Sequence, residues 1–154
     1  MARDIKFDID GFRFNYRVAA IILRDECVLV EQVAGESYWF LPGGRVKLGE
    51  RTESALVREI DEELAIPAVV QRLTFVVESF FTSGDTRFHE VCFYFETQLE
   101  TSGQGSALQL APPGKSTYKW ARLDEVGTLD IQPTFLRRRL QSLPAAAEHL
   151  VLNE

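Results

Sequence analysis

Residues 44–66 read GRVKLGERTESALVREIDEELAI and join a glycine-rich turn to a run of carboxylates. On a helix, where successive residues are about 100° apart, Glu59, Glu62 and Glu63 share one face because they stand at positions i, i+3 and i+4. Like charges at this spacing destabilise a bare helix, whereas carboxylate oxygens are the ligands that a hard divalent cation prefers. The segment therefore predicts a cation site on a helix.

An apolar stripe runs along the same stretch. Leu56, Ile60 and Leu64 recur at helical spacing and predict that a helix from Thr52 to Leu64 packs one side against a core. An acidic helix face by itself usually only contacts water. The residues around the acidic triplet are what separate this segment from a merely solvated face.

The whole segment resembles the Nudix box, G-x5-E-x7-R-E-U-x-E-E-x-G-U, in which U is a bulky aliphatic residue. The match falls on Gly44, Glu50, Arg58, Glu59, Ile60, Glu62, Glu63 and Ile66, and Leu41-Pro42-Gly43 precedes it as is usual in that family. Ala65 departs from the pattern, because it stands where the box has its second glycine. A residue there is commonly left-handed, so Ala65 should cost about 1 kcal/mol or shift the helix end.

The resemblance implies a fold and a reaction. The fold would be a Nudix-type α/β/α sandwich, which is an α+β fold with a mixed β-sheet between helices, and residues 1–154 would form a single domain, as their number also suggests. The reaction would be hydrolysis of the diphosphate linkage in a nucleoside diphosphate joined to another group X. Mg²⁺ or Mn²⁺ would be the cofactor.

The resemblance also assigns roles within the box. Glu62 and Glu63 would be metal ligands, and Glu59 would be a further ligand or the general base that activates water. Arg58 stands four residues before Glu62, close enough on a helix for an ion pair that orients the carboxylate. These residues form the expected catalytic centre.

Supporting residues precede the helix. Gly43 would offer its carbonyl oxygen to the metal, Gly44 would let the backbone approach closely, and Glu50 would lie near the same cluster. Together these three residues would complete the metal site from the segment that precedes the helix.

Many relatives supply another acidic ligand a few residues before a tryptophan like Trp120, but residues 115–119 here contain no carboxylate. Glu78 and Glu90 are the candidates to replace it, since each interrupts an apolar strand and an unpaired buried carboxylate is costly. Whether they share a face depends on the hairpin register, and the alternative is that one or both point to solvent or bond a backbone group. His89 should point away from Glu90, because side chains alternate along a strand, and should be a packed or surface residue.

Composition excludes several other classes of protein. A net charge of −6 and a pI near 5.0 argue against a stable nucleic-acid partner, and the basic run 137–139 is best explained as a solvated face. No apolar run of eighteen residues indicates a membrane segment, so a cytoplasmic location is expected. Cys27 and Cys92 lack metal-ligand spacing and could be small buried residues, or a pair only by accident of geometry.

The remaining pattern predicts mostly strands. A hairpin is expected over residues 7–14 around Asp10-Gly11, and a second over 69–81 and 87–98. Further strands are expected at 16–23, 27–33 and 118–123, a loop at 100–116, a helix at 133–143, and a helical or frayed tail at 145–154. The edge of the first hairpin could support a homodimer.

The Nudix box does not identify the group X that is joined to the nucleoside diphosphate, and two alternatives to a hydrolase stay open. One is a nucleotide-binding or regulatory module of this fold that is catalytically silent. The other is an isoprenoid-diphosphate isomerase, which would require Cys27 or Cys92 in the pocket. The expected substrate is a small nucleotide or another organic diphosphate.

Overall fold

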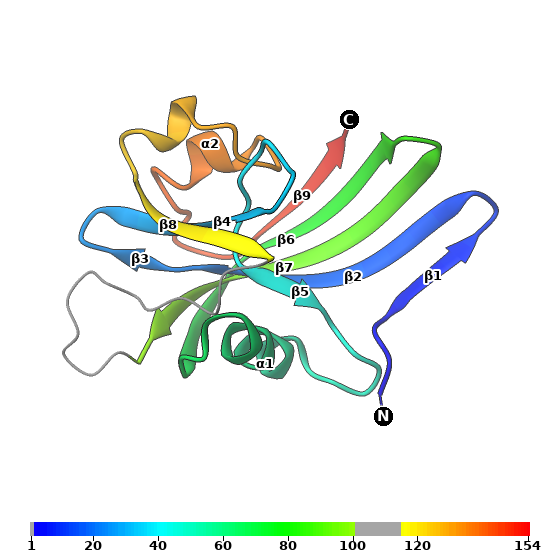
Figure 1. Cartoon of the computed structure of the whole chain (residues 1–154), viewed down its shortest axis with the longest axis horizontal. Helices are drawn as coiled ribbons and strands as arrows, with labels where there is room; N and C mark the ends of the chain where they lie inside the picture. Colours follow the sequence, from blue (N-terminus) through cyan, green and yellow to red (C-terminus); the bar gives the residue numbers. More distant parts are fainter. Residues whose placement is uncertain (1, 101–114) are drawn as a thin grey trace.

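The computed structural model describes residues 2–100 and 115–154, in which two β-sheets and two α-helices are present (Figure 1). The elements in chain order are β1 (Lys6–Ile9), β2 (Phe12–Ile21), β3 (Leu23–Arg24), β4 (Cys27–Val33), β5 (Gly43–Arg45), α1 (Thr52–Leu64), β6 (Ala68–Ser83), β7 (Thr86–Leu99), β8 (Ser116–Arg122), the 3-10 turn η1 (Val126–Thr128), α2 (Leu136–Arg139) and β9 (Glu148–Asn153).

The larger sheet has the strand order β1-β2-β7-β6-β9, and β5 pairs with β2 as well. Strands β2 and β7 are parallel, as are β6 and β9, whereas the other pairs are antiparallel. The sheet is therefore mixed, and strands far apart in the sequence lie side by side in it. A smaller antiparallel sheet has the order β3-β4-β8.

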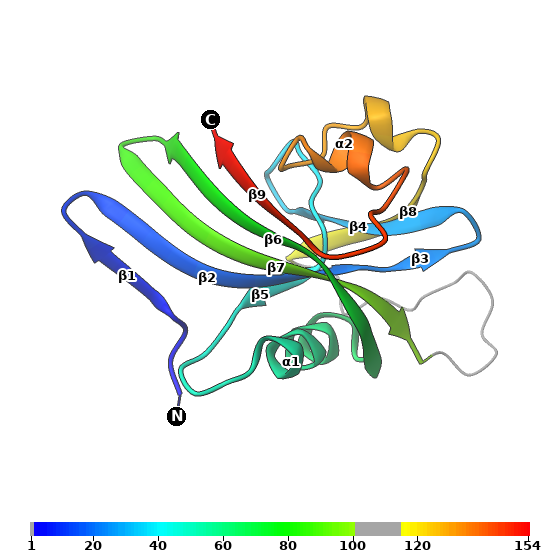
Figure 2. The same ribbon diagram turned by 180° about the vertical axis from the view of Figure 1, so that it is seen from behind.

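The two helices lie on opposite sides of the strands, as both views show (Figure 1, Figure 2). One core cluster packs around α1 and includes Val18, Ala20 and Phe95. The other lies toward α2 and includes Ala19 and Tyr94, their neighbours on the opposite face of the sheet. This confirms the sequence expectation of an α+β sandwich with a mixed sheet between helices.

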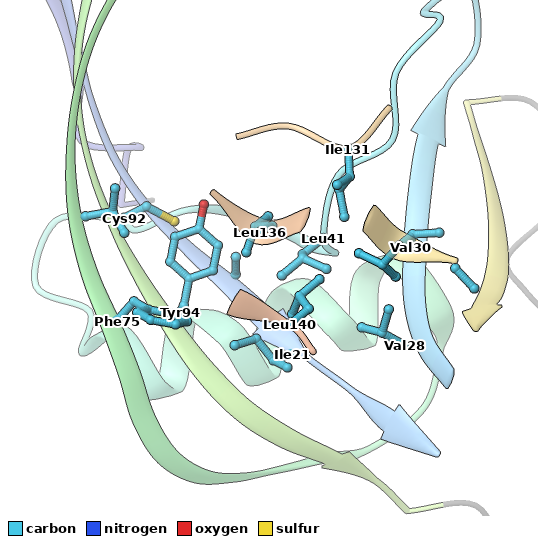
Figure 3. Close-up of a cluster of buried hydrophobic side chains, with 14 residues drawn as sticks. Ile21, Val28, Val30, Leu41, Phe75, Cys92, Tyr94, Ile131, Leu136 and Leu140 are labelled. Atoms are coloured by element: carbon cyan, nitrogen blue, oxygen red, sulfur yellow. The ribbon is translucent and has the colours of Figure 1, made fainter. Parts of the chain in front are cut away.

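The cluster on the α2 side contains one of the two free cysteines (Figure 3). Cys92 and Tyr94 extend from β7 toward Leu136 and Leu140. Cys92 is buried, as the sequence predicts, whereas Cys27 keeps partial exposure. Cys92 therefore packs as a small apolar residue.

Several sequence predictions are confirmed. Helix α1 spans Thr52–Leu64, and Ala65 follows it in the left-handed region at φ 54° with its N–H bonded to the Asp61 carbonyl. The first hairpin turns at Asp10 and Gly11, both with positive φ. The helix end thus keeps the geometry that glycine usually provides, and does so with alanine.

Two predictions near the C-terminus are wrong. The tail is a strand, β9, because its alternating exposed and half-buried residues pair in parallel with β6. The helix expected over 133–143 is α-helical only at Leu136–Arg139, because turns with i to i+3 hydrogen bonds occupy the residues on either side. The run 137–139 is also less solvated than predicted, since Arg137 bonds Asp130 and Arg139 bonds Glu148.

The loop expected over 100–116 falls almost entirely on residues 101–114, which lie outside the described residues. Within the described ranges, no helix has both the length and the apolar character needed to cross a membrane.

Candidate active site

Helix α1 carries the predicted carboxylates beside its buried stripe. Leu56, Ile60 and Leu64 are buried in the core. Because that stripe fixes the helix, the glutamates next to it emerge along one edge, where the side chain of Glu59 is 15% exposed and that of Glu62 is 53% exposed. The row of carboxylates therefore runs from the interior toward solvent.

Arg58 joins three of the box carboxylates. Its Nε and Nη2 atoms donate to the two oxygens of Glu50 at 2.7 and 2.9 Å. Its Nη1 atom donates to Glu59 at 2.9 Å and lies 3.3 Å from Glu62, and Nη2 also donates to the Arg45 carbonyl at 3.0 Å. The predicted ion pair between Arg58 and Glu62 is confirmed, but the two hydrogen bonds from Arg58 to Glu50 are shorter.

These contacts affect Glu50 and Glu59 differently. The hydrogen bonds from Arg58 lower the pKa of Glu50, and the Lys47 backbone N–H adds to this at 3.0 Å. Burial raises the pKa of Glu59 despite its bond to Arg58. Glu50 therefore stays ionised, while Glu59 takes up a proton more readily than an ordinary glutamate.

The two glycines before the box are required by close packing. Strand β5 pairs Gly43 with Ala19 and Gly44 with Val18. A Cβ atom on Gly43 would overlap the Val18 carbonyl oxygen, and one on Gly44 would overlap the Glu59 carboxyl group. The glycines thus let β5 lie against β2 and leave room for Glu59.

Glu63 contacts a residue that the sequence analysis missed. Its carboxyl group interacts with that of Glu31 on β4 and accepts a long hydrogen bond, 3.4 Å, from the Tyr118 hydroxyl. Burial, together with the charge of Glu31, raises the pKa of Glu63 to about 9. Glu31 interrupts the apolar run of β4 just as Glu78 and Glu90 interrupt theirs, so the signal was present in the sequence.

The structure separates Glu78 from Glu90. Glu78 stands opposite Val91 and Glu90 opposite Ser79, so the two carboxylates lie on different faces of the sheet. Glu78 pairs with His149 at 2.5 Å, whereas Glu90 accepts a 2.7 Å hydrogen bond from Asn15. The two do not form a joint replacement site.

His89 packs as the sequence predicts. Its ring lies between those of Phe14 and Phe80, with centroid distances of 5.3 and 4.5 Å. It therefore acts as a packed residue next to the hairpin.

A pocket of about 570 Å³ lies on the sheet face that carries Ala19 and Cys92. Its lining combines polar residues with aromatic rings, including Asn15, Arg17, Arg45, Glu90, Tyr38, Phe81 and Phe88. Burial raises the pKa of both Glu31 and Glu59, and the positive charge of Arg17 opposes that rise in each case. Arg17 therefore connects the pocket with the box carboxylates electrostatically.

The carboxylates form two subsets. Arg58 holds Glu50, Glu59 and Glu62, while Glu63 pairs with Glu31. In residues 2–100 and 115–154, no three carboxylate, histidine or cysteine side chains are already arranged around a single metal-sized point. The residue types and the room at Gly44 nevertheless fit a divalent cation bound by oxygen ligands.

Known proteins similar to this chain share the box and the fold. Residues 13–143 match the NUDIX domain model. Putative nudix hydrolase 1 of Caenorhabditis elegans is 38% identical over 61% of this chain and 27% of its own length, and the CTP pyrophosphohydrolase of Escherichia coli (strain K12) is 46% identical over 34% and 42%. Each match spans less than half of the relative's length.

A solved structure extends the likeness to the whole fold. The MutT protein from Methanosarcina mazei Go1 superposes with a TM-score of 0.63, at 19% identity, over 87% of this chain and 94% of that one. The matched family model covers most of the chain, including β2, the box, both helices and β8. The chain therefore belongs to the Nudix family.

Proposed function

We propose that the protein is a divalent-metal-dependent hydrolase that cleaves the diphosphate linkage of a nucleoside diphosphate joined to another group X. The observation that carries this proposal is the single guanidinium of Arg58, which holds Glu59 and Glu62 on α1 and Glu50 in the loop before it. Nudix hydrolases generally use divalent metals, and Mg²⁺ or Mn²⁺ is the proposed cofactor here. Glu59, Glu62, Glu63 and the Gly43 carbonyl would hold it.

The bound cation would neutralise charge on the diphosphate oxygens and make water easier to deprotonate. Glu59 would be a ligand or the base that takes the proton, and its raised pKa favours the second role. Water adds to one phosphorus, the bridging P–O bond breaks, and the proton taken from water is returned to the phosphate products. Arg58 acts as a positioning residue for the carboxylates.

The pocket would bind the rest of the substrate. Arg17 and Arg45 supply positive charge for phosphate oxygens, and Tyr38, Phe81 and Phe88 supply rings on which a planar group could stack. The name of the Escherichia coli relative specifies CTP, while that of the Caenorhabditis elegans relative specifies no substrate. The Escherichia coli name supports pyrophosphate hydrolysis, and X stays open.

The proposal is tested by product analysis. The full chain is incubated with Mg²⁺ and, in turn, with nucleotide sugars, ADP-ribose, dinucleoside polyphosphates, and ordinary and oxidised nucleoside triphosphates. We expect cleavage of one class to a nucleoside monophosphate and the complementary phosphate product. Glu62→Gln and Glu63→Gln should each reduce kcat by at least a hundredfold, because each removes a charge that the transition state needs.

Glu78→Gln is the matched control, because Glu78 lies on the other sheet face from Glu90 and pairs with His149. Full activity of both box variants would contradict the proposal. Tight nucleotide binding with no product over long incubation, in Mg²⁺ and in Mn²⁺, would instead assign a silent binding module. Cys92 lines the pocket, as the isomerase alternative requires, but burial raises the pKa of its thiol to about 12, which disfavours the reactive thiolate.

Three further expectations from the sequence belong to this proposal. Residues 1–154 would act as one catalytic domain, the protein would work in the cytoplasm, and two copies could pair through the edge strand β1. The exposed side chains of Phe7 and Ile9 on that strand are compatible with pairing. Size-exclusion chromatography with light scattering measures the oligomeric state directly.

A further inference from the structure

Glu31 is a buried carboxylate with one unsatisfied oxygen. The residue is 5% exposed. Its Oε2 atom accepts a 2.7 Å hydrogen bond from the Ser116 hydroxyl, whereas its Oε1 atom is buried and has no hydrogen-bond partner. A buried ionised oxygen without a partner is costly, so something outside the described contacts should compensate it.

The neighbouring carboxyl group of Glu63 adds to the cost of burying Glu31. The carboxyl groups of Glu31 and Glu63 interact directly. Both groups are hydrogen-bond acceptors when ionised, and the Tyr118 hydroxyl carries only one proton for the pair. Two carboxylates in this arrangement need either a shared proton or a cation between them.

The backbone holds Glu31 in this position. On one side β4 pairs with β8, which sets Glu31 opposite Tyr118. On the other side, Glu31 exchanges two backbone hydrogen bonds with Phe40, at 2.7 and 2.8 Å. With both edges bonded, the backbone keeps the Glu31 side chain on this face of the strand.

Few positive charges are available to neutralise the pair. The guanidinium of Arg58 already binds Glu50, Glu59 and Glu62. Arg17 acts on Glu31 and Glu59 through its charge, as the weakest of the effects on each. The region around Glu63 therefore carries an excess of negative charge that suits a divalent cation bound by oxygen atoms.

We propose that Glu31 is a metal ligand, which together with Glu63 holds a divalent cation between β4 and α1. This inference rests on the proposed role of Glu63 and adds a ligand from outside the box. It also accounts for the unsatisfied oxygen, since a cation bound there would be its partner.

Metal binding without substrate tests the inference. The full chain is titrated with Mn²⁺ alone, and free Mn²⁺ is followed by electron paramagnetic resonance. Glu31→Gln and Glu63→Gln should each weaken binding at least tenfold. The double variant should lose little more than either single variant, because both residues hold the same ion. Glu78→Gln should bind as the unmodified chain does.

Thermal unfolding separates this role from a purely structural one. If Glu31 is a ligand, Glu31→Gln should have an equal or higher Tm without metal, because it removes a buried repulsion, and a smaller Tm increase on adding Mn²⁺. If Glu31 is structural, the metal-free Tm should fall and the metal response should stay. The second result would overturn the inference.

Glu31→Met provides a second variant that fills similar space without a charge. It too should fold and bind Mn²⁺ weakly. Unchanged Mn²⁺ affinity in either variant, an unmodified chain that binds no Mn²⁺, or failure of both variants to fold would each overturn the inference. Mn²⁺ binding that depends on Glu31 in a chain that hydrolyses no diphosphate would contradict the proposed reaction and leave the ligand assignment in place.

Discussion

At the scale of single residues, Arg58 organises the candidate site. Its side chain is only 22% exposed, and it makes bidentate contact with Glu50 while also reaching Glu59 and Glu62. A planar guanidinium can satisfy several carboxylates at once, whereas a lysine ammonium presents a point charge on a flexible stem. The geometry therefore depends on the shape of this group as well as on its charge.

We expect Arg58→Lys to lower kcat at least tenfold while the charge is kept, because Glu59 and Glu62 lose their fixed donor. Steady-state kinetics on the substrate identified by product analysis measure the change. Arg122→Lys is the matched control, since Arg122 makes a bidentate contact with Asp124 at an exposed site. Equal kcat values for the two variants would contradict the positioning role of Arg58.

The same variant should change acid stability. Arg58 lowers the pKa of Glu50 below its usual value of 4.5, so this pairing stabilises the fold above that pH and loses its effect as the pH falls through the lowered pKa. With lysine at position 58 the pKa of Glu50 should move back up. The acid-unfolding midpoint, measured by circular dichroism without metal, should then shift to higher pH.

Residue-level prediction from sequence succeeded where the chemistry is local. The box carboxylates stand within fourteen positions of one another, Glu50 to Glu63, and helix geometry places Glu59, Glu62 and Glu63 along one side of α1. Glu31 shows a local signal, a carboxylate that interrupts an apolar run, but its contact with Glu63 requires β4 to pair with β8 and α1 to pack beside them. Such a contact depends on tertiary structure that no spacing rule contains.

At the scale of elements, α1 ends in a strained residue. Ala65 has φ 54°, a conformation that costs a residue with a Cβ atom about 1–2 kcal/mol relative to the usual helical region. Its N–H still bonds the Asp61 carbonyl, so the helix end is intact. Helix α1 therefore ends in the left-handed geometry that the Nudix box predicts, but alanine in that position lowers the stability of the fold.

Ala65→Gly should therefore stabilise the protein. The free energy gained by relieving the strain exceeds the entropic cost of ordering the more flexible glycine on folding. We expect the free energy of unfolding to rise by about 0.5–1 kcal/mol, which corresponds to a Tm increase of about 2–3 °C at this chain length. Ala55→Gly, in the buried interior of the same helix, should lower the Tm. A decrease in Tm for Ala65→Gly would show that the left-handed residue is not strained.

The hairpins and α1 were predictable because their signals are local, namely turn residues and a helical apolar stripe. The tail was not, because Leu150 and Leu152 become strand residues only when β9 pairs in parallel with β6, some seventy residues earlier in the chain. The three consecutive apolar residues 150–152 form a run too short to decide between helix and strand without that partner.

At the scale of the whole molecule, the pocket is assembled from distant parts of the chain. Arg17 comes from β2, Ser79 from β6, Glu90 from β7 and Leu152 from β9. The parallel pairings of β2 with β7 and of β6 with β9 bring these strands together. The sequence predicts a mixed sheet, but the strand order and hence the pocket come from packing between elements.

The position of β9 has a practical consequence for handling the protein. Glu154 lines the pocket, and its backbone N–H bonds the Phe80 carbonyl, so a purification tag attached after residue 154 starts at the pocket rim. The N-terminus leaves from another part of the molecule, beside the loop at residues 47–48 (Figure 1). A C-terminal tag should raise KM and leave the Tm unchanged, whereas an N-terminal tag of the same sequence should leave KM unchanged. Equal KM values for the two tagged forms would show that the rim at Glu154 does not contact the substrate.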